Sequence, residues 1–346
     1  MLKGDREDQR FFDSILQARL EGLRKALGSY VSLVSWSRDR QQVVAVTSGG
    51  SDPGTYWLLN GREAKVLAYA YPRIPDANVG EARGITYRAA DGLEIHGVLT
   101  LPPGRDPRRL PLIVMPHGGP EAHDAIGFDW WAQAFAGRGY AVFQPNFRGS
   151  DNLGPEFRDA GFGEWGRKMQ TDISDGVAEL GRQGVVDPAR ICIVGASYGG
   201  YAALAGVTVQ HGLYRCAVSV AGLADLNHML DWEARLQGRD ARNPTTRYWR
   251  RFMGVRQDED PALRAISPAR LAAQADAPVL LIHGADDTTV PIKQSQMMEQ
   301  ALKVAGKPVE MVVLKGEDHS LSQGATRTQM LQAAVKFVEA NNPPDP

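Results

Sequence analysis

The chain has 346 residues, 43% hydrophobic and 23% charged, which is the composition of an ordinary globular protein with room for one large domain and a smaller one. A formal net charge of −1 excludes a general electrostatic footprint for nucleic acid or an anionic membrane. Only two cysteines, Cys192 and Cys216, are present, too few for a disulfide framework or a cysteine-based zinc cluster. Both are expected in strands as small buried apolar groups.

The first ten residues, MLKGDREDQR, lack the apolar segment of a signal peptide. No apolar run approaches the roughly 18 residues that a membrane span requires. The cytoplasm is therefore the expected location, and neither a membrane nor nucleic acid is an expected partner.

Residues 10–27 place apolar side chains at spacings of three and four, which predicts a helix with one packing face. Four short strand-like runs separated by turn-rich segments follow, at 30–36, 42–47, 55–59 and 65–70. They predict a four-stranded antiparallel sheet. The Pro-, Gly- and charge-rich stretch at 75–83 is typical of a linker, so the expected domains are residues 1–75 and 76–346.

Beyond the linker, two antiparallel strands are predicted at 84–89 and 93–101, and strands then alternate with helices, as in an α/β fold. The mostly apolar parallel strands are expected at 112–115, 141–144, 191–194, 216–220, 279–282 and 310–314. The helices between them are expected at 129–137, 169–184, 198–209, 293–305 and 326–341. Residues 223–276 are too long for an ordinary connection and predict a helical excursion over one end of the sheet.

One serine has the setting of a nucleophile. Gly195-Ala196-Ser197-Tyr198-Gly199 fits the pattern G-x-S-x-G between a predicted strand and a predicted helix. The bare pattern is weak in a chain with 37 glycines, and a capping serine in a small-residue turn is the alternative. The strand-turn-helix setting favours a nucleophile elbow, where a Cβ at Gly195 or Gly199 would crowd the turn.

A serine hydroxyl is a poor nucleophile until a base removes its proton, so this interpretation requires a histidine oriented by a carboxylate. The α/β-hydrolase order along the chain is serine, acid, histidine. Four histidines follow Ser197, namely His211, His228, His283 and His319. His319, in LKGEDHSL, follows the last predicted strand in the loop before the final helix, where this fold places its base.

The acid is expected in LIHGADDTTVP, after the strand predicted at 279–282, where Asp286 and Asp287 are adjacent. Neighbouring side chains of an extended turn point apart, so one of them is expected to meet the imidazole while the other caps the turn or is solvated. The residues alone leave this choice open.

An oxyanion requires hydrogen-bond donors. One is expected to be the backbone N–H of Tyr198, at the start of the helix after the nucleophile, where partial positive charge gathers. The second is expected from the loop MPHGGPEAHD after the strand at 112–115, where Gly118 or Gly119 lets a backbone N–H approach a reacting carbonyl.

Seven motifs together resemble the catalytic domain of the prolyl oligopeptidase family of serine peptidases, in particular its acylaminoacyl-peptidase and dipeptidyl-aminopeptidase-like branch. The resemblance covers roughly residues 76–342. The motifs occur in the family's order: HGGP at 117–120, NFRGS at 146–150, GEWG at 163–166, GASYGGYAA at 195–203, SPAR at 267–270, LIHGADDTTVP at 281–291 and GEDH at 316–319.

The resemblance implies an α/β-hydrolase fold with Ser197 as nucleophile, His319 as general base and Asp287 as orienting acid. The family's spacing G-x-x-D-x-x-V-P selects Asp287 over its neighbour. By the same resemblance, Arg148 is a loop-bracing arginine near the site. The candidate residues of the substrate pocket are His117, Arg148 and Trp232.

This chain differs from the usual members of the family in one large respect. Members usually carry an N-terminal β-propeller that screens substrates by size, whereas residues 1–75 resemble only its last part, about one blade. A single blade cannot bury both of its faces, so it is expected to pack against the hydrolase domain or against another copy of the chain. A homo-oligomer formed through the N-terminal sheet is one such arrangement.

The sequence therefore predicts a serine hydrolase that cleaves short peptides or acyl-peptides through an acyl-enzyme, with no metal and no cofactor. A carboxylesterase with an open active site is the first alternative. A catalytically silent, truncated interaction module is the second, and the presence of all three triad residues weighs against it.

Overall fold

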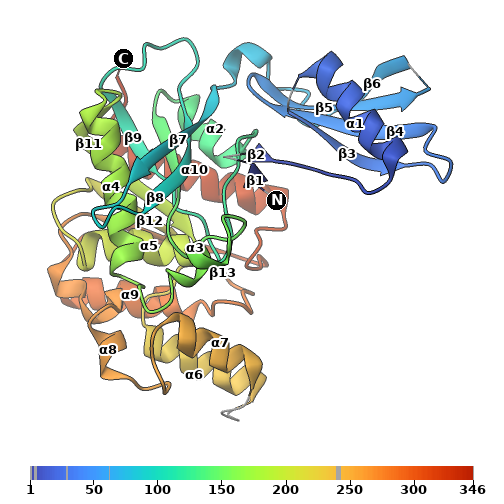
Figure 1. Ribbon diagram of the computed structural model, residues 1–346. Helices are drawn as coiled ribbons and strands as arrows, with labels where there is room; N and C mark the ends of the chain where they lie inside the picture. The colour runs from blue at the N-terminus through green and yellow to red at the C-terminus, as the bar shows by residue number, and fades with distance from the viewer. Residues whose placement is uncertain (1, 4–5, 29, 62, 239–242, 346) are drawn as a thin grey trace.

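The computed structural model describes residues 2–3, 6–28, 30–61, 63–238 and 243–345 (Figure 1). An eight-stranded sheet forms the centre of the larger part of the chain. Its strands, in spatial order, are β14 (Val309–Leu314), β13 (Val279–Gly284), β12 (Cys216–Val220), β11 (Val186–Ala196), β9 (Leu110–Val114), β10 (Ala141–Asn146), β8 (Glu94–Thr100) and β7 (Ala82–Arg88).

The six strands from β14 to β10 are parallel, whereas β8 pairs antiparallel with both β10 and β7. Every residue of β9, β10, β12 and β13 is buried, as expected for strands covered on both faces. All eight strands predicted after the linker are present. The predicted α/β-hydrolase class is therefore confirmed for this part of the chain.

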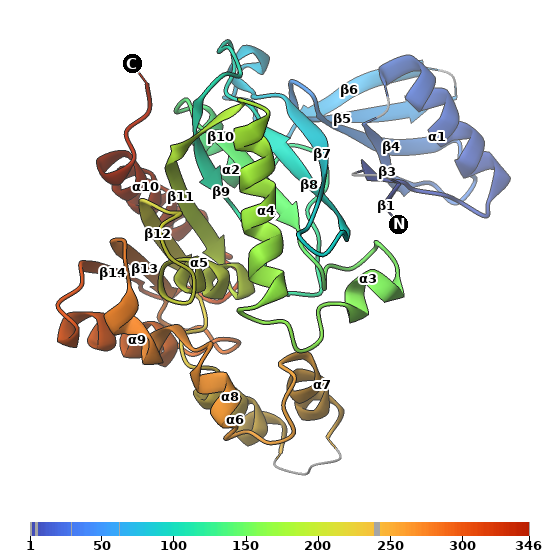
Figure 2. The same ribbon diagram turned by 60° about the vertical axis from the view of Figure 1, so that its left-hand side comes forward.

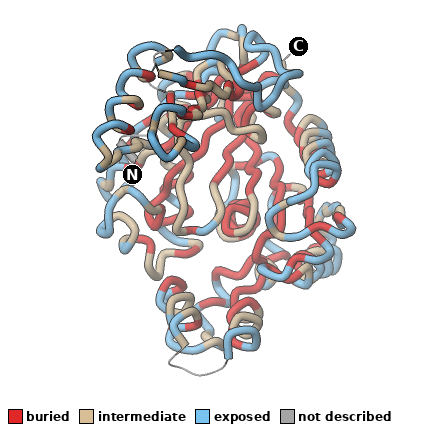
Figure 3. Tube along the Cα trace, turned by 90° about the vertical axis from the view of Figure 1, so that its right-hand side faces the viewer, coloured by how far each residue is buried: buried red, intermediate tan, exposed pale blue. Residues whose placement is uncertain are grey.

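Helices cover both faces of the sheet (Figure 2). On one face, α4 (Lys168–Arg182), α5 (Tyr198–Thr208) and α9 (Lys293–Val304) bury their apolar side chains in the largest core cluster. On the other face, α2 (Trp130–Ala136) and α10 (Gly324–Asn341) form a second cluster with side chains of the same strands. Figure 3 shows the buried residues concentrated along the central sheet and its flanking helices.

The predicted excursion lies between β12 and β13. It contains α6 (Leu226–Gln237), α7 (Pro244–Phe252), α8 (Pro261–Arg264), η2 (Pro268–Arg270) and η3 (Ala272–Gln274). Residues 239–242 of this segment lie outside the described residues. Figure 1 shows α6 and α7 side by side at one end of the molecule, away from the N-terminal sheet. The helical character predicted for the segment is confirmed.

The N-terminal part forms its own small sheet, which projects from one side of the molecule (Figure 1). The sheet has the order β3 (Val31–Trp36), β4 (Gln42–Gly49), β5 (Asp52–Asn60) and β6 (Glu63–Tyr69), antiparallel throughout, as predicted. One face is covered by α1 (Ser14–Leu27), which the Asp13 carboxylate caps by accepting hydrogen bonds from two backbone N–H groups.

A few contacts join this small sheet to the rest of the chain. The N–H of Phe128 donates to Ser48 Oγ at 3.2 Å, and the rings of Tyr71 and Phe128 lie 4.8 Å apart. Between the two parts, the linker contains the short 3₁₀ helix η1 (Asp76–Asn78). These contacts agree with the first of the two expected arrangements, in which the sheet packs against the larger part of the chain.

Four short elements were not predicted, one of which is the η1 helix of the linker. Strands β1 (Leu2–Lys3) and β2 (Arg6–Glu7) form a two-residue pairing before α1, and α3 (Pro155–Asp159) is a single helical turn after β10. Segments of two to five residues are too short to show a hydrophobic period, so pattern analysis has no signal for them.

The expectation that the two cysteines are separate apolar groups is wrong, because Cys192 and Cys216 form a disulfide. Both lie in strands and both are buried, as predicted. However, β11 and β12 are neighbours whose register sets these two residues directly opposite each other, with a Cα–Cα distance of 4.8 Å. That distance is within the range that a disulfide bridges. Counting cysteines gives no information about such a register.

No helix in the described part of the chain is long and apolar enough to cross a membrane.

Candidate active site

Ser197 lies at a sharp turn where β11 ends at Ala196 and α5 begins at Tyr198. Its φ of 56° and ψ of −120° are unfavourable for a residue with a side chain. The turn is tight enough that a Cβ on Gly195 would collide with the backbone of Gly199, and one on Gly199 with the carbonyl of Pro116. These contacts explain why glycines flank the serine, and they agree with the predicted nucleophile elbow.

The structure brings Asp287 and His319 together, although 32 residues separate them in the sequence. Asp287 follows β13 and His319 follows β14, and these strands are parallel neighbours, so their carboxyl ends meet at one edge of the sheet. His319 Nδ1 lies 2.7 Å from Asp287 Oδ2. A carboxylate can only accept, so Nδ1 carries a proton, and in the neutral imidazole Nε2 has a lone pair.

Asp287 is held in its ionised form. Burial alone would raise its pKa, but hydrogen bonds from His283 and His319 outweigh burial and hold the pKa of Asp287 well below its usual range. The other oxygen, Oδ1, accepts from the N–H groups of Thr289 and Val290, both at 2.9 Å. Asp286, by contrast, is exposed, which agrees with the choice of Asp287 made from the family's spacing.

His283 is a second histidine beside Asp287 that the sequence analysis did not assign to the site. Its Nε2 lies 2.8 Å from the carbonyl of Val290 and 3.3 Å from Asp287 Oδ2. Since a carbonyl can only accept, Nε2 carries a proton, and Nδ1 faces Ser295 Oγ at 2.7 Å. His283 is completely buried and thus fixes the acid loop. Its position in IHGADD, four residues before the acid, was the available signal.

Glu317 anchors the loop that presents His319. It is fully buried, and its carboxylate accepts hydrogen bonds from the N–H of Asp318 at 3.0 Å, from the N–H of Gln323 at 3.3 Å and from the hydroxyl of Thr326. These contacts tie the loop to the start of α10. The motif GEDH contains this residue, but the sequence analysis gave it no role.

The structure does not join Ser197 to His319. Among the described residues, the Ser197 hydroxyl makes no hydrogen bond, and the imidazole makes one, to Asp287. The serine and the acid loop nevertheless share one cavity, since Thr289 and Val290 line it together with Ser197. Catalytic hydrogen bonds are often long or misaligned in the absence of substrate and tighten when it binds.

The predicted oxyanion loop lies beside the serine. A Cβ built on Gly118 would stand 3.4 Å from Ser197 Cβ and 4.0 Å from its Oγ, so the backbone at Gly118 borders the hydroxyl. Gly119 has a φ of +111°, in the region that favours glycine, and lines the same cavity as Ser197. Tyr198 occupies the first position of α5, where its N–H has no intrahelical partner.

His117 fixes this loop through both of its ring nitrogens. Nδ1 donates to the carbonyl of Gly118 at 2.7 Å, and Nε2 lies 2.9 Å from Ser150 Oγ. The ring stacks on Phe147 at 4.4 Å. Burial lowers the pKa of His117 to about 4, so the imidazole is neutral at pH 7. With both nitrogens engaged, the ring acts on the loop's shape, and contact with substrate stays a prediction.

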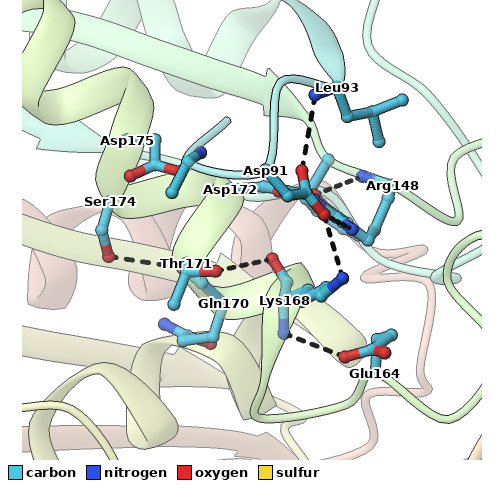
Figure 4. A network of polar contacts seen from close by, with 12 residues as sticks. Asp91, Leu93, Arg148, Glu164, Lys168, Gln170, Thr171, Asp172, Ser174 and Asp175 are labelled. Carbon is cyan, nitrogen blue, oxygen red and sulfur yellow. Dashed lines mark hydrogen bonds and ion pairs between the residues drawn. The ribbon is translucent and has the colours of Figure 1, made fainter. Parts of the chain in front are cut away.

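Arg148 is buried between two carboxylates (Figure 4). Its guanidinium donates to Asp172 at 2.7 and 2.8 Å and to Asp91 at 2.8 and 3.0 Å, and its backbone N–H also donates to Asp172 at 3.0 Å. Lys168 adds a second cation on Asp91 at 3.0 Å, and hydrogen bonds from Arg148 and Lys168 hold the pKa of Asp91 well below its usual range. These bonds brace the loop after β10, as the resemblance implied.

A cavity opens at Ser197. Its lining is mostly apolar and comes from five separate segments: Gly119, Trp165, Ser197, Leu223, Met229, Leu230, Glu233, Trp249, Met253, Thr289 and Val290. Trp232, the third candidate pocket residue, is not among them and packs against the largest core cluster, while its neighbour Glu233 faces the cavity.

A family model described as the prolyl oligopeptidase family matches residues 126–342. The chain belongs to the prolyl oligopeptidase family. The matched region includes β10 and everything after it, and so contains Ser197, Asp287 and His319.

Individual relatives agree with this assignment. The chain is 29% identical over 337 residues to "Dipeptidyl aminopeptidase BIII" of Pseudoxanthomonas mexicana, covering 92% of this chain and 47% of that protein. It is 25% identical to the human "Acylamino-acid-releasing enzyme", covering 95% of this chain and 48% of that protein. The chain thus spans about half the length of the curated relatives it matches.

Solved structures show the same fold. A puromycin-hydrolysing peptidase from Mycobacterium tuberculosis superimposes with a TM-score of 0.76 at 25% identity, covering 87% of this chain and 46% of that one. Acylaminoacyl peptidase from Pyrococcus horikoshii gives a TM-score of 0.77 at 24% identity, over 92% of this chain and 51% of that one. Both likenesses support the α/β-hydrolase fold of this chain.

Proposed function

We propose that this protein is a serine peptidase that hydrolyses short peptides or acyl-peptides through an acyl-enzyme on Ser197, His319 and Asp287. The single observation that supports the proposal most is the 2.7 Å contact between Asp287 and His319 at the sheet edge where the strained Ser197 turn also lies. Family membership supports the reaction class.

The geometry supports the following steps. Ser197 Oγ attacks the substrate carbonyl carbon while His319 Nε2, which has a free lone pair, removes the hydroxyl proton. Asp287 stabilises the imidazolium through Nδ1. The backbone N–H of Tyr198 and that of Gly118 or Gly119 hold the oxyanion. His319 then gives the proton to the leaving amine, and water repeats the sequence on the acyl-enzyme.

The direct test is Ser197→Ala with an activated acyl ester as substrate. We expect turnover to fall at least about 10³-fold, because the oxyanion donors alone leave only a small residual rate. Ser51→Ala, at an exposed turn of the N-terminal sheet, is the matched control and should keep full activity. Full turnover by Ser197→Ala protein would contradict the proposal.

A matched pair of substrates separates the peptidase from the alternatives. Turnover of a peptide anilide together with the corresponding ester supports a peptidase. A negligible amide rate with a kept ester rate would favour a carboxylesterase. Failure of a fluorophosphonate probe to label Ser197 would instead favour a silent interaction module.

A homo-oligomer through the N-terminal sheet is part of the proposal. In the described part of the chain β6 pairs only with β5, and all seven of its residues are exposed, Val66 and Leu67 among them. An exposed apolar edge strand is a template for pairing with a second strand. We expect sedimentation to show a dimer that Leu67→Lys converts to a monomer. A monomeric wild-type protein would contradict this.

We propose the cytoplasm as the compartment of this protein. The sequence analysis expected the cytoplasm, whereas disulfides persist mainly in oxidising compartments. We keep the cytoplasm as the proposal because the bridge is fully buried and thus shielded from reductants. Differential alkylation in fractionated cells would check it, and recovery of the protein from an oxidising compartment alone would overturn it.

A further inference from the structure

The cavity beside Ser197 is lined mostly by apolar and aromatic side chains. Apart from backbone at Gly119, the serine itself and Thr289, its lining is apolar or aromatic with one exception. Except for Trp249, which is partly exposed, the apolar members are almost completely buried, among them Leu230 at 0% and Trp165 at 1% exposed. A pocket of this kind next to the nucleophile is positioned to receive the P1 side chain, that of the residue whose carbonyl is attacked.

The exception is Glu233. It lies on α6, four residues after Met229 and three after Leu230, and these spacings place all three side chains on one helix face toward the cavity. Among the described residues Glu233 has neither a hydrogen bond nor an ion pair, and burial raises its pKa. Its neighbour on the same helix, Asp231, is paired with Arg235.

An unpaired carboxylate in apolar surroundings destabilises the free protein, since its lost hydration is not replaced. Such groups persist mainly at functional sites, where a ligand supplies the missing partner. A cation that enters the cavity would find one acidic group and two tryptophans, whose ring faces attract cations. The methylene groups of a lysine or arginine would meanwhile pack against leucine and methionine.

We infer that Glu233 is the specificity-determining residue of the acyl pocket, and that the pocket selects a P1 residue with a long apolar stem and a cationic end, lysine or arginine. This inference rests on the proposed function. It names the substrate class of that site, and it assigns Glu233 no part in bond making or breaking.

The test compares Nα-blocked anilides with lysine and with norleucine at P1, because the two side chains share the methylene stem and differ in the charge. We expect wild-type kcat/KM to be at least about tenfold higher for lysine. Glu233→Gln should remove this preference by lowering the lysine value while leaving the norleucine value within about threefold. Glu259→Gln, an exposed carboxylate of the same excursion, is the control and should change neither value.

A binding measurement gives the same information without turnover. Ser197→Ala protein should bind the lysine peptide at least about tenfold more tightly than the norleucine peptide, and adding Glu233→Gln should abolish the difference. Equal wild-type kcat/KM for the two substrates, or equal losses for both in Glu233→Gln, would overturn the inference.

Three further outcomes are informative. If Glu233→Gln slows only substrates with a free α-amino group, Glu233 recognises the amino terminus, and the inference is wrong. If wild-type protein hydrolyses both substrates equally and fluorophosphonate labels Ser197, the proposed function stands while the inference fails. If no substrate is hydrolysed and no label is incorporated, the proposed function itself fails, and the inference with it.

Discussion

The carboxylate of Asp287 receives four hydrogen-bond donors from three segments of the chain. His283 and His319 approach one oxygen, and the N–H groups of Thr289 and Val290 approach the other. Two of these donors are backbone groups of the acid loop itself, so the carboxylate also determines the shape of that loop. Because Asp287 is ionised and immobile, it keeps the proton of His319 on Nδ1.

Asp287→Asn should therefore abolish most of the activity while keeping the fold. We expect kcat to fall about 10⁴-fold, because an amide no longer fixes the proton on His319 Nδ1. Asp286→Asn is the matched control, since Asp286 is adjacent and exposed. Steady-state kinetics with an activated ester would check both, and a larger loss in Asp286→Asn would reverse the assignment.

The lowered pKa of Asp287 predicts that the stability of the protein depends on pH. The folded pKa of Asp287 is lower than its unfolded value, so the stabilisation is fully present above the ordinary aspartate pKa and is lost as pH falls toward the folded value. Denaturant titrations below about pH 5 should show the free energy of unfolding falling more steeply in wild type than in Asp287→Asn. Parallel curves for the two proteins would contradict this.

At the scale of elements, Arg148 connects three pieces of the fold. It lies in the loop after β10, Asp172 lies on α4, and Asp91 lies in the turn between β7 and β8 (Figure 4). The loop continues to Ser150, which contacts His117 in the loop after β9. The ion pairs thus support the backbone next to Ser197 without reaching the cavity.

Arg148→Met should destabilise the protein by about 3–5 kcal/mol, since it leaves Asp172 buried without its partner. Arg182→Met is the control. It removes an exposed arginine from α4, the helix that carries Asp172, and the partner of this arginine is Glu179. Its free energy of unfolding should not change measurably. Urea denaturation would check both, and similar stability of the two variants would show that the buried pair contributes little.

Most elements could be predicted because their length gave the hydrophobic period room to appear. The helix on the small sheet, α1, repeats leucines over four turns, and the central strands are mostly apolar. The single turn of α3 and the two-residue strands β1 and β2 have no such pattern. The site residues were likewise predictable where a local pattern exists, since short motifs predicted Ser197 and His319. Glu233 belongs to no motif, and only the packing of the excursion directs its helix face to the cavity.

At the scale of the whole molecule, the small N-terminal sheet and the larger α/β part have separate cores. The cluster under α1 draws all its members from residues before the linker, and the other two clusters draw theirs from residues after it. The few contacts around Phe128 join the two parts. The central sheet, by contrast, is bridged covalently between β11, which leads to Ser197, and β12.

Replacing both Cys192 and Cys216 with alanine should lower the free energy of unfolding by about 3 kcal/mol. The bridge closes a loop with a sequence separation of 24, which restricts the unfolded chain. Guanidinium denaturation of the oxidised wild type and the double variant would measure the difference. Activity should be kept, because neither side chain lines the cavity. Equal stability would show that the bridge does not form in solution.

The sequence by itself determined the order of strands and helices, the glycine-flanked serine and the motifs of a family, because periodicity, turn chemistry and short motifs are local properties. The tertiary structure decided which distant groups became neighbours. The β11–β12 register joined the cysteines, the adjacency of β13 and β14 brought Asp287 to His319, and the packing of α6 placed Glu233 at the cavity that Ser197 also lines. These distances depend on packing between segments, which no local pattern records.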